Sequence, residues 1–256
     1  MKIGPLAKTQ ILNLRINLGA KRYFAEVILT ESYKMAGQTV ITVNTAHLNS
    51  LRNNSQYQIA SQNALLVLPD GWPIALLASL AVKKIQKRVT GSDLIPYIFN
   101  MPKEKILKIA ILGVPSSFDA KLDQLMFENT ERIDLVYKNS MPQEVFNSPL
   151  VLGEIAQEVS KSSPNLIITC FGSPKQEIFN EFYLRNTSMG VAIGVGATLD
   201  FLLGAQRRSP LVFRLLGLEW AFRLIRNPRR LFRRYLIATI EFSKLLLEYL
   251  FQKRTH

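Results

Sequence analysis

The chain has 256 residues, of which 48% are hydrophobic and 20% charged, a balance typical of a folded protein with a sizeable core. This composition excludes intrinsic disorder and a multi-span membrane protein. The net charge is +13, and residues 206–256 hold 12 of the Lys and Arg residues but only 3 of the Asp and Glu residues. We therefore expect an anionic partner for this segment, either a membrane surface or a nucleic acid.

Apolar runs and helical patterns alternate along the first 204 residues. The runs predicted to be strands are residues 39–43, 64–68, 108–113, 133–137, 165–172 and 190–196. The helices predicted after them cover residues 46–60, 72–84, 116–129, 150–161, 174–184 and 197–204. Six repeats of strand then helix predict an α/β fold, a doubly wound parallel sheet with helices on both faces.

Residues 205–256 have a different texture, helical, arginine-rich and aromatic, and are predicted to form an appendage. Pro228 is predicted to start a new helix there. Arginines recur at three- and four-residue intervals, which predicts one shared helical face for Arg223, Arg226, Arg230 and Arg233 or Arg234. The final apolar run carries Glu241, Lys244 and Glu248 on one face, so it is predicted to be amphipathic and not membrane-spanning.

Residues able to do chemistry gather in four loops that follow predicted strands, where an open α/β sheet binds its ligand. The first loop offers Thr42, Asn44 and His47, and the second contains Asp70. The third and fourth, residues 171–177 and 194–200, are glycine-containing turns into helices, which can bind phosphate through free N–H groups. Neither has the spacing of a P-loop or a dinucleotide fingerprint, so the pattern alone is weak.

Asp70 has two readings at this point. Pro-Asp-Gly is a common turn sequence, which needs no function. A carboxylate at the end of a buried strand is also suited to act as a general base, because Asp is ionised at neutral pH and partial burial would raise its pKa usefully.

The sequence contains no recognisable metal-binding constellation. Its only histidines are His47 and His256, and neither its carboxylates nor its cysteine are spaced as metal ligands. We expect a reaction that uses no metal and no other cofactor. The single cysteine, Cys170, lies in an apolar run and is expected to be a core thiol in a reducing compartment. The N-terminal segment lacks the features of a signal peptide.

A set of motifs resembles the WecG/TagA/CpsF family of bacterial glycosyltransferases and appears in that family's order. The motifs are residues 40–48, 66–74, 87–94, 171–177, 194–201 and, above all, 207–236 with its GLEW, PRRL and RRYL segments. The resemblance implies a Rossmann-like catalytic core, residues 1–204, and a membrane-contacting appendage, residues 205–256. It implies an inverting, metal-independent hexosyltransferase that moves a sugar from a UDP-sugar to a polyprenyl-diphosphate-linked acceptor. The reaction would occur at the cytoplasmic face of the bacterial cell membrane, in surface polysaccharide synthesis.

The resemblance also implies roles for individual residues. Asp70 matches the family's proposed catalytic base. The substrate-binding residues that it implies are Thr42, Asn44, Gln176, Arg223, Arg230 and Arg233, of which the arginines would close over the diphosphates. Weaker candidates for nucleotide or phosphate binding are Gly172, Ser173, Lys175, Gly194 and Gly196. The chain departs from the family pattern at residues 45–47, which bears on sugar preference, and at Trp72-Pro73, which is expected to reshape the acceptor side.

Two rival functions stay open. One is a nucleic-acid-binding protein that uses the basic tail, although the apolar residues beside the arginines argue against it, because tracking phosphates does not require them. The other is a non-catalytic scaffold that binds a nucleotide and recruits partners to the membrane. The donor sugar, the acceptor sugar, the pathway and the oligomeric state, including self-association away from the membrane, are also left open.

Overall fold

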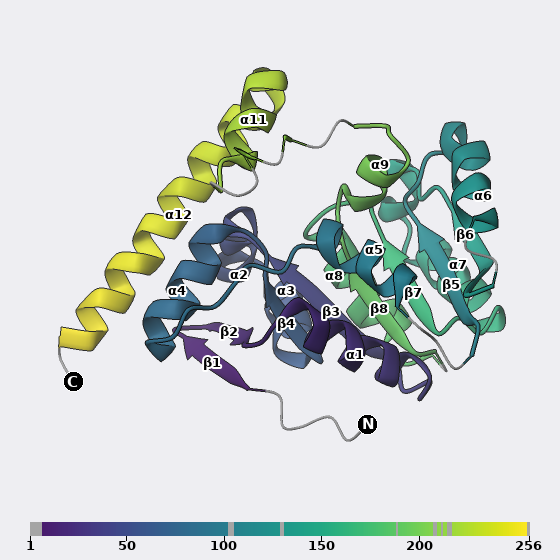
Figure 1. Cartoon of the computed structure of the whole chain (residues 1–256), viewed down its shortest axis with the longest axis horizontal. Helices are drawn as coiled ribbons and strands as arrows, with labels where there is room; N and C mark the ends of the chain where they lie inside the picture. The colour runs from purple at the N-terminus through teal and green to yellow at the C-terminus, as the bar shows by residue number, and fades with distance from the viewer. Residues whose placement is uncertain are drawn as a thin grey trace.

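Six parallel strands form the central sheet, in the order β4-β3-β8-β7-β5-β6 (Figure 1). The computed structural model describes residues 7–101, 105–128, 131–187, 189–206, 209–210, 212–213 and 217–254, without the side chains of Arg230, Lys253 and Arg254. The strands are β3 (Gln38–Val43), β4 (Leu66–Pro69), β5 (Leu107–Leu112), β6 (Ile133–Asn139), β7 (Leu166–Thr169) and β8 (Val191–Gly194). Each predicted strand is present, and the α/β class is confirmed.

Helices cover both faces of this sheet, as the alternating pattern predicts. The helices are α1 (Lys21–Ser32), α2 (Leu48–Asn53), α3 (Ser55–Asn63), α4 (Trp72–Val82), α5 (Gly91–Asn100), α6 (Asp119–Phe127), α7 (Pro149–Lys161), α8 (Lys175–Phe179), α9 (Thr198–Leu202), α11 (Glu219–Arg226) and α12 (Pro228–Arg254). Successive residues of β3 enter different clusters: Val40 packs with α1, α5 and α9, whereas Ile41 packs with α2, α3 and α4. This alternation is what a strand buried on both faces requires.

Three predicted helices differ from the observed ones. The helix predicted over residues 46–60 is a short 3-10 turn, η1 (Thr45–His47), followed by α2 and α3. Asn54 has an extended backbone between α2 and α3, and its side chain caps α3 by accepting from the amide of Tyr57. The helix predicted over residues 174–184 passes from α8 into a π-helical segment, η4 (Asn180–Leu184). The helix predicted over residues 116–129 begins as a 3-10 turn, η2 (Ser116–Phe118), before α6.

Elements that the strand-and-helix repeat did not include complete the core. They are α1, α5 and an N-terminal antiparallel pair, β1 (Lys8–Ile11) and β2 (Leu14–Asn17). The pair closes the end of the sheet beside β4: the side chain of Asn17 accepts a hydrogen bond of 2.8 Å from the amide of Val67.

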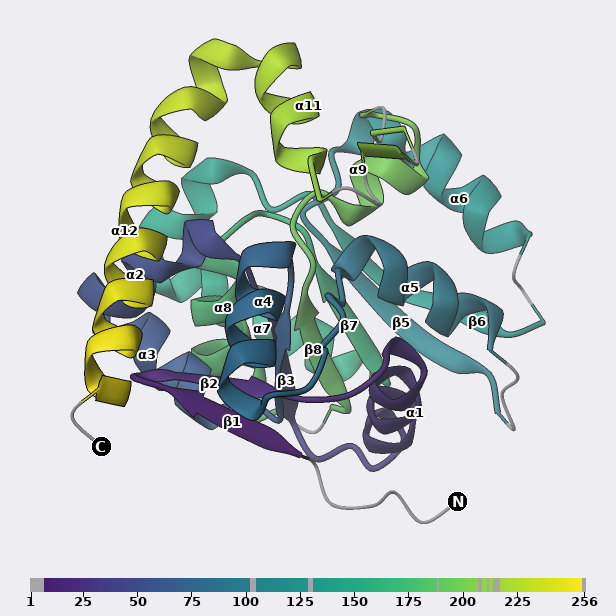
Figure 2. The ribbon, with the colours of Figure 1, turned by 60° about the vertical axis from the view of Figure 1, so that its left-hand side comes forward.

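The appendage consists, in its described part, of two helices that meet at Asn227. Pro228 starts α12, as predicted, and the non-helical backbone of Asn227 (φ −137°, ψ 61°) separates it from α11. This break places Arg223 on α11 and Arg233 on α12, so the prediction of a single arginine face is wrong. In Figure 2, α11 lies above α4 and α9, and α12 runs along the side of the molecule.

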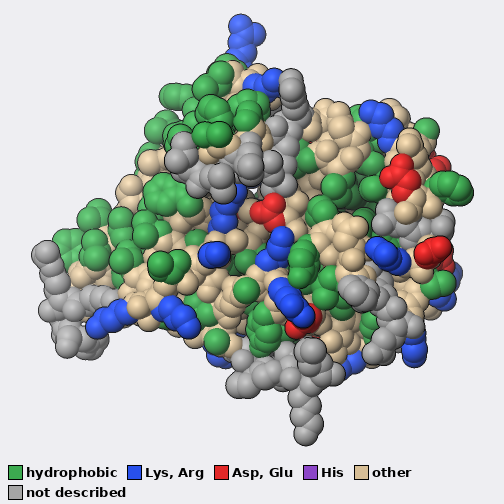
Figure 3. All heavy atoms as spheres, viewed as in Figure 1, with side chains coloured by type: hydrophobic (Ala, Val, Ile, Leu, Met, Phe, Trp, Pro, Cys, Tyr) green, Lys and Arg blue, Asp and Glu red, His purple; other side chains and the backbone are tan. Residues whose placement is uncertain are grey.

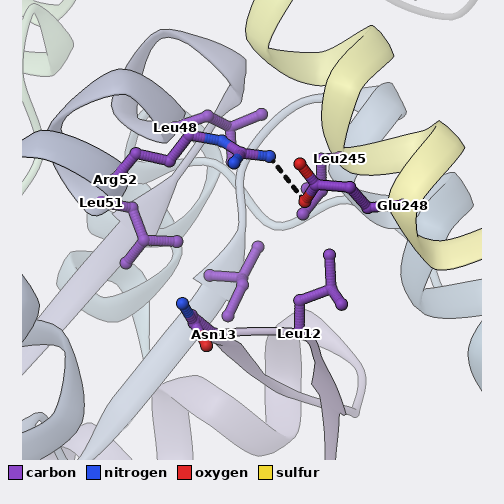
Figure 4. A pocket seen from close by; sticks show the side chains of 8 residues that line it. Leu12, Asn13, Leu48, Leu51, Arg52, Leu245 and Glu248 are labelled. Carbon is purple, nitrogen blue, oxygen red and sulfur yellow. Dashed lines mark hydrogen bonds and ion pairs between the residues drawn. The ribbon is translucent and has the colours of Figure 1, made fainter. Parts of the chain in front are cut away.

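Helix α12 is docked on the core through both apolar and charged side chains. Leu245 and Tyr249 are buried in the cluster that contains Ile41 of β3. Beside them, Arg52 of α2 forms ion pairs with Glu241 (3.0 Å) and Glu248 (2.8 Å) of α12. A cavity of about 40 Å³ lies at this junction, between the β1–β2 turn, α2 and α12 (Figure 4). Among the described helices, none is both long and apolar enough to cross a bilayer.

Candidate active site

Asp70 lies at the carboxyl end of β4, in a turn that also starts α4. Its amide donates to the carbonyl of Val43 at 2.8 Å, which continues the pairing between β3 and β4 for one residue. Gly71 then adopts φ +95°, a conformation that favours glycine, and α4 begins at Trp72. The Pro-Asp-Gly sequence therefore is a turn, and this turn presents a carboxylate at the ligand-binding edge of the sheet.

The surroundings of Asp70 raise the pKa of its carboxyl group to about 6. Burial is the largest cause, and the nearby carboxylate of Glu219 adds to it. A hydrogen bond of 3.4 Å from Nδ2 of Asn44 and the positive charges of Arg223 and Arg88 act in the opposite direction. A carboxylate with a pKa just below neutrality is ionised at cellular pH and remains basic enough to accept a proton.

Asn44 is held by the loop that follows β3. Its Oδ1 accepts a hydrogen bond of 3.0 Å from the amide of Ala46, which caps η1, and its own amide donates to Nδ1 of His47 at 3.3 Å. The cap leaves Nδ2 of Asn44 to face Asp70. Burial, together with the charge of Arg234, lowers the pKa of His47 to about 3, so this histidine is neutral and serves the loop.

Gln176 joins the two glycine loops that follow β7 and β8. Its Oε1 accepts from the amides of Gly172 (3.2 Å) and Gly196 (3.3 Å), and Nε2 donates to Glu177 at 2.8 Å. A Cβ on Gly194 would lie 2.6 Å from Nε2 of Gln176, so only glycine fits there. Both glycine amides proposed for phosphate binding thus donate to Gln176 in this state.

The other candidates from the sequence are divided between this edge and the surface. Thr42 lies inside β3, where its hydroxyl donates to the carbonyl of Gly194 at 3.1 Å. Ser173 has a buried hydroxyl with no hydrogen-bond partner among the described residues. Lys175 is not brought to Asp70: its Nζ donates to Gln143 at 2.6 Å and lies 4.6 Å from the ring centre of Phe146.

Helix α11 brings charged residues to Asp70. Nη1 of Arg88 lies 3.5 Å from Glu219, and Nε of Arg223 lies 3.9 Å from the same carboxylate. The guanidinium of Arg223 also stacks 4.8 Å from the ring centre of Phe201 on α9. Nε of Arg223 is buried and makes no hydrogen bond to any described residue. It is therefore a charged donor that an incoming anion could satisfy.

The arginines of α12 differ in what they face. Arg233 is exposed, and the side chain of Arg230 lies outside the described part of the structure. The charge of Arg234 acts on two buried groups, His47 and Glu177, and lowers the pKa of each. For Glu177, burial has the larger effect and raises the pKa of its carboxyl group. Arg234 is thus the described arginine of α12 that acts on the buried groups beside the site.

Sequence reasoning missed Arg88, Glu219 and Arg234 as site residues. Each lies within a motif that carries the family resemblance, which is the signal that could have found them. For Arg88 the structural reason is plain, because the amide of the next residue, Val89, donates to the carbonyl of Pro69 at 2.8 Å. The segment that contains Arg88 is therefore fixed beside the end of β4.

A second hollow lies at the other end of the same sheet edge. It has a volume of about 160 Å³, and its lining includes Ile111 and Val114 from the end of β5, Ser116 and the end of β6 around Asn139. Cys170 packs against the core, and burial raises the pKa of its thiol. Within the described ranges, no three His, Cys, Asp or Glu side chains gather as a metal site would require.

Comparison with known proteins identifies the family. The family model for "Glycosyl transferase WecG/TagA/CpsF family" matches residues 9–256. An N-acetylglucosaminyldiphosphoundecaprenol N-acetyl-beta-D-mannosaminyltransferase from Bacillus spizizenii is 26% identical over 195 residues, 76% of this chain and 73% of the relative. The enzyme of the same name from Bacillus subtilis is 24% identical over 195 residues, with the same shares covered. The chain belongs to the WecG/TagA/CpsF family and is a glycosyltransferase.

Proposed function

We propose that the protein transfers a sugar from a UDP-sugar to a polyprenyl-diphosphate-linked acceptor sugar, with inversion and without a metal, in bacterial surface polysaccharide synthesis. The observation that carries this proposal is the partly buried carboxylate of Asp70, with a pKa of about 6 and with Arg88 and Arg223 beside it. The names of the two relatives favour N-acetylmannosamine as the sugar transferred and an N-acetylglucosaminyl-diphosphoundecaprenol as the acceptor.

Asp70 acts as the general base in this proposal. The acceptor hydroxyl loses its proton to the carboxylate as its oxygen attacks the anomeric carbon of the donor, and the bond from that carbon to the UDP oxygen breaks on the opposite face. One carboxylate is sufficient for such a single displacement. Nδ2 of Asn44, 3.4 Å from Asp70, holds the carboxylate toward the substrate.

The arginines stabilise the leaving diphosphate. A guanidinium group stays charged and can bind two phosphate oxygens at once. Arg223, with its buried Nε lacking a hydrogen bond among the described residues, and Arg88 are supported by their positions near Asp70. Arg230 and Arg233 are added on the family resemblance, and they would approach from α12.

The donor is proposed to lie across the carboxyl edge of the sheet. Asp70 follows β4, and the 160 Å³ hollow lies at the end of β5 and β6. Four inter-strand steps separate β4 from β5, a span of about 19 Å at about 4.8 Å per step. An extended nucleotide sugar suits this span, with its nucleoside in the hollow, its diphosphate over the glycine loops and its sugar beside Asp70.

The appendage is proposed to bind the cytoplasmic face of the cell membrane. Its outer surface is apolar: the exposed side chains include Trp220 and Ile225 of α11 and Phe232, Leu236, Ile240 and Leu247 of α12. Figure 3 shows hydrophobic side chains gathered over this side of the molecule. Exposed arginines, Arg229 and Arg233 among them, accompany these residues. Basic helices with an apolar face bind anionic membrane surfaces, whereas a nucleic acid would leave the apolar face without a partner.

The test is UDP release from a panel of UDP-sugars that starts with UDP-N-acetylmannosamine. The acceptor is a polyprenyl-diphosphate-N-acetylglucosamine, and the assay contains a chelator and anionic liposomes. We expect turnover with one donor and a loss of at least about 100-fold in Asp70→Asn, the scale of a general base. The matched control is Asp134→Asn, which changes an exposed acid on β6.

Equal turnover in Asp70→Asn and wild type would refute the role of the base. Absence of turnover with every donor, together with nucleotide binding and an intact cellular function in Asp70→Asn, would favour the scaffold. Salt-dependent binding to DNA in place of liposomes would favour the nucleic-acid rival.

A further inference from the structure

Helix α4 carries an exposed apolar stripe that begins at the proposed active site. Trp72, Leu76 and Leu80 are 45%, 44% and 44% exposed, and their four-residue spacing puts them on one face. The opposite face of α4, which includes Ile74 and Leu77, is fully buried. From Trp72 to Leu80 the stripe is about 12 Å long at about 1.5 Å per residue.

Both ends of the stripe have distinct surroundings. At the near end, Trp72 follows Asp70 by two residues, and its indole packs so closely on Gly217 that a Cβ there would lie 2.7 Å from Cδ1. The far end continues into Ile85, which is 87% exposed and stands among the exposed lysines Lys83, Lys84 and Lys87. The stripe thus leads from the carboxylate to a basic rim.

The apolar stripe of α12 is not placed in this way. Ala238, Leu245 and Tyr249 turn the inner face of α12 to the core, so Leu236, Ile240 and Leu247 point away from it. This outer face suits a membrane surface. It does not begin at Asp70, whereas the stripe on α4 does.

We propose that the stripe of Trp72, Leu76 and Leu80 binds the first isoprene units of the acceptor's polyprenyl chain. This inference rests on the proposed function, in which the acceptor is a sugar joined through a diphosphate to a polyprenol. With the sugar hydroxyl at Asp70, the chain leaves the diphosphate close to the start of α4. Covering exposed leucine and tryptophan side chains with isoprene units removes apolar surface from water on both partners.

The remainder of the chain returns to the bilayer at the basic rim. Lysines near a membrane are attracted to anionic lipid headgroups, and an exposed isoleucine among them can enter the interface. The rim of Lys83, Lys84, Ile85 and Lys87 provides these features at the end of the stripe farther from Asp70. Three exposed apolar residues in line are thereby explained, where isolated ones would need no explanation.

The test uses Trp72 itself as the reporter, without membranes and without turnover. The protein has two tryptophans, so Trp220→Phe leaves Trp72 as the only indole in the full-length chain. Farnesyl diphosphate, kept below its micelle-forming concentration, is the probe, and inorganic diphosphate is the control ligand. We expect a blue shift of the Trp72 emission with farnesyl diphosphate and no shift with inorganic diphosphate.

Paired variants in this background locate the binding. Leu76→Gln with Leu80→Gln keeps helix propensity and side-chain size while removing apolar surface, and should weaken farnesyl diphosphate about 10-fold. Ile240→Gln with Leu247→Gln makes the same change on α12 and should keep the affinity. Thermal unfolding verifies that both pairs are folded.

The inference is overturned if Trp72 does not respond, if the α4 pair binds as the parent does, or if both pairs weaken binding equally. The last result would mean unspecific adsorption to apolar surface. Because this assay measures binding, an enzyme that fails the donor panel but shows the α4-dependent shift would refute the proposed reaction alone.

Discussion

Replacing Asp70 by Asn should make the protein more stable at neutral pH while removing its activity. The fold raises the pKa of this carboxyl from 3.8 to about 6, so it holds an ionised group that it favours in the protonated form. At about 1.36 kcal/mol per pKa unit, the two-unit difference costs about 3 kcal/mol of folding free energy at neutral pH. Asn carries no charge, is similar in shape and can still accept from Nδ2 of Asn44.

The sign of the pH dependence distinguishes this cause from a general packing effect. A carboxyl with a raised folded-state pKa costs nothing below 3.8, where it is protonated in both states, and the full cost appears as the pH rises past about 6. The gain of Asp70→Asn over wild type should therefore be largest above neutrality and should shrink as the pH is lowered toward about 4.

The assay is urea or thermal unfolding of wild type and Asp70→Asn at several pH values. A gain of about 3 kcal/mol corresponds to an increase in Tm of about 6–12 °C for a chain of this size. Asp134→Asn, at an exposed position of β6, is the control and should leave Tm nearly unchanged. A variant no more stable than wild type above neutral pH, or a gain that is the same at every pH, would refute the reasoning.

Further predictions concern activity, docking and the loops. In wild type, kcat/KM should fall about 10-fold per pH unit below about 6, as Asp70 becomes protonated, and a profile flat to about pH 4.5 would contradict the proposed base. Arg52→Met leaves a buried acid of α12 without its partner, so it should loosen α12 by about 3 kcal/mol in hydrogen exchange, whereas Arg22→Met, at an exposed pair, should change little. Gly194→Ala should destabilise the protein by about 1–3 kcal/mol and raise KM, because the new Cβ meets Gln176 at 2.6 Å; an unchanged KM would show that this brace does not shape the site.

The sheet could be predicted because each of its strands has a clear local signal. A run such as residues 64–68 is apolar throughout, as strands buried on both faces are. The β1–β2 pair gives no such signal, since its strands have four residues each and mix polar with apolar side chains. Helix α5 contains Pro96, which argues against a helix when only the sequence is available.

The site was predictable where it depends on neighbouring strands. Asn44 and Asp70 directly follow the paired residues Val43 and Pro69, so once β3 and β4 are adjacent their side chains must meet. The contributions of Glu219 and Arg234 depend on how α11 and α12 dock, which no local pattern specifies. The division into a core of residues 1–204 and an appendage stays a prediction.

Charge balance links the appendage to the reaction. In the structure, the positive charges of Arg88 and Arg223 face the negative charges of Asp70 and Glu219, so the group is close to neutral. A diphosphate that enters beside Asp70 adds negative charge that this balanced group does not offset, and further cations must approach. The arginines of α12 are the nearest such supply in the chain, and the field of Arg234 already reaches His47 and Glu177. Substrate binding and docking of α12 must then strengthen each other, because a ligand that prefers the docked state stabilises it by mass action.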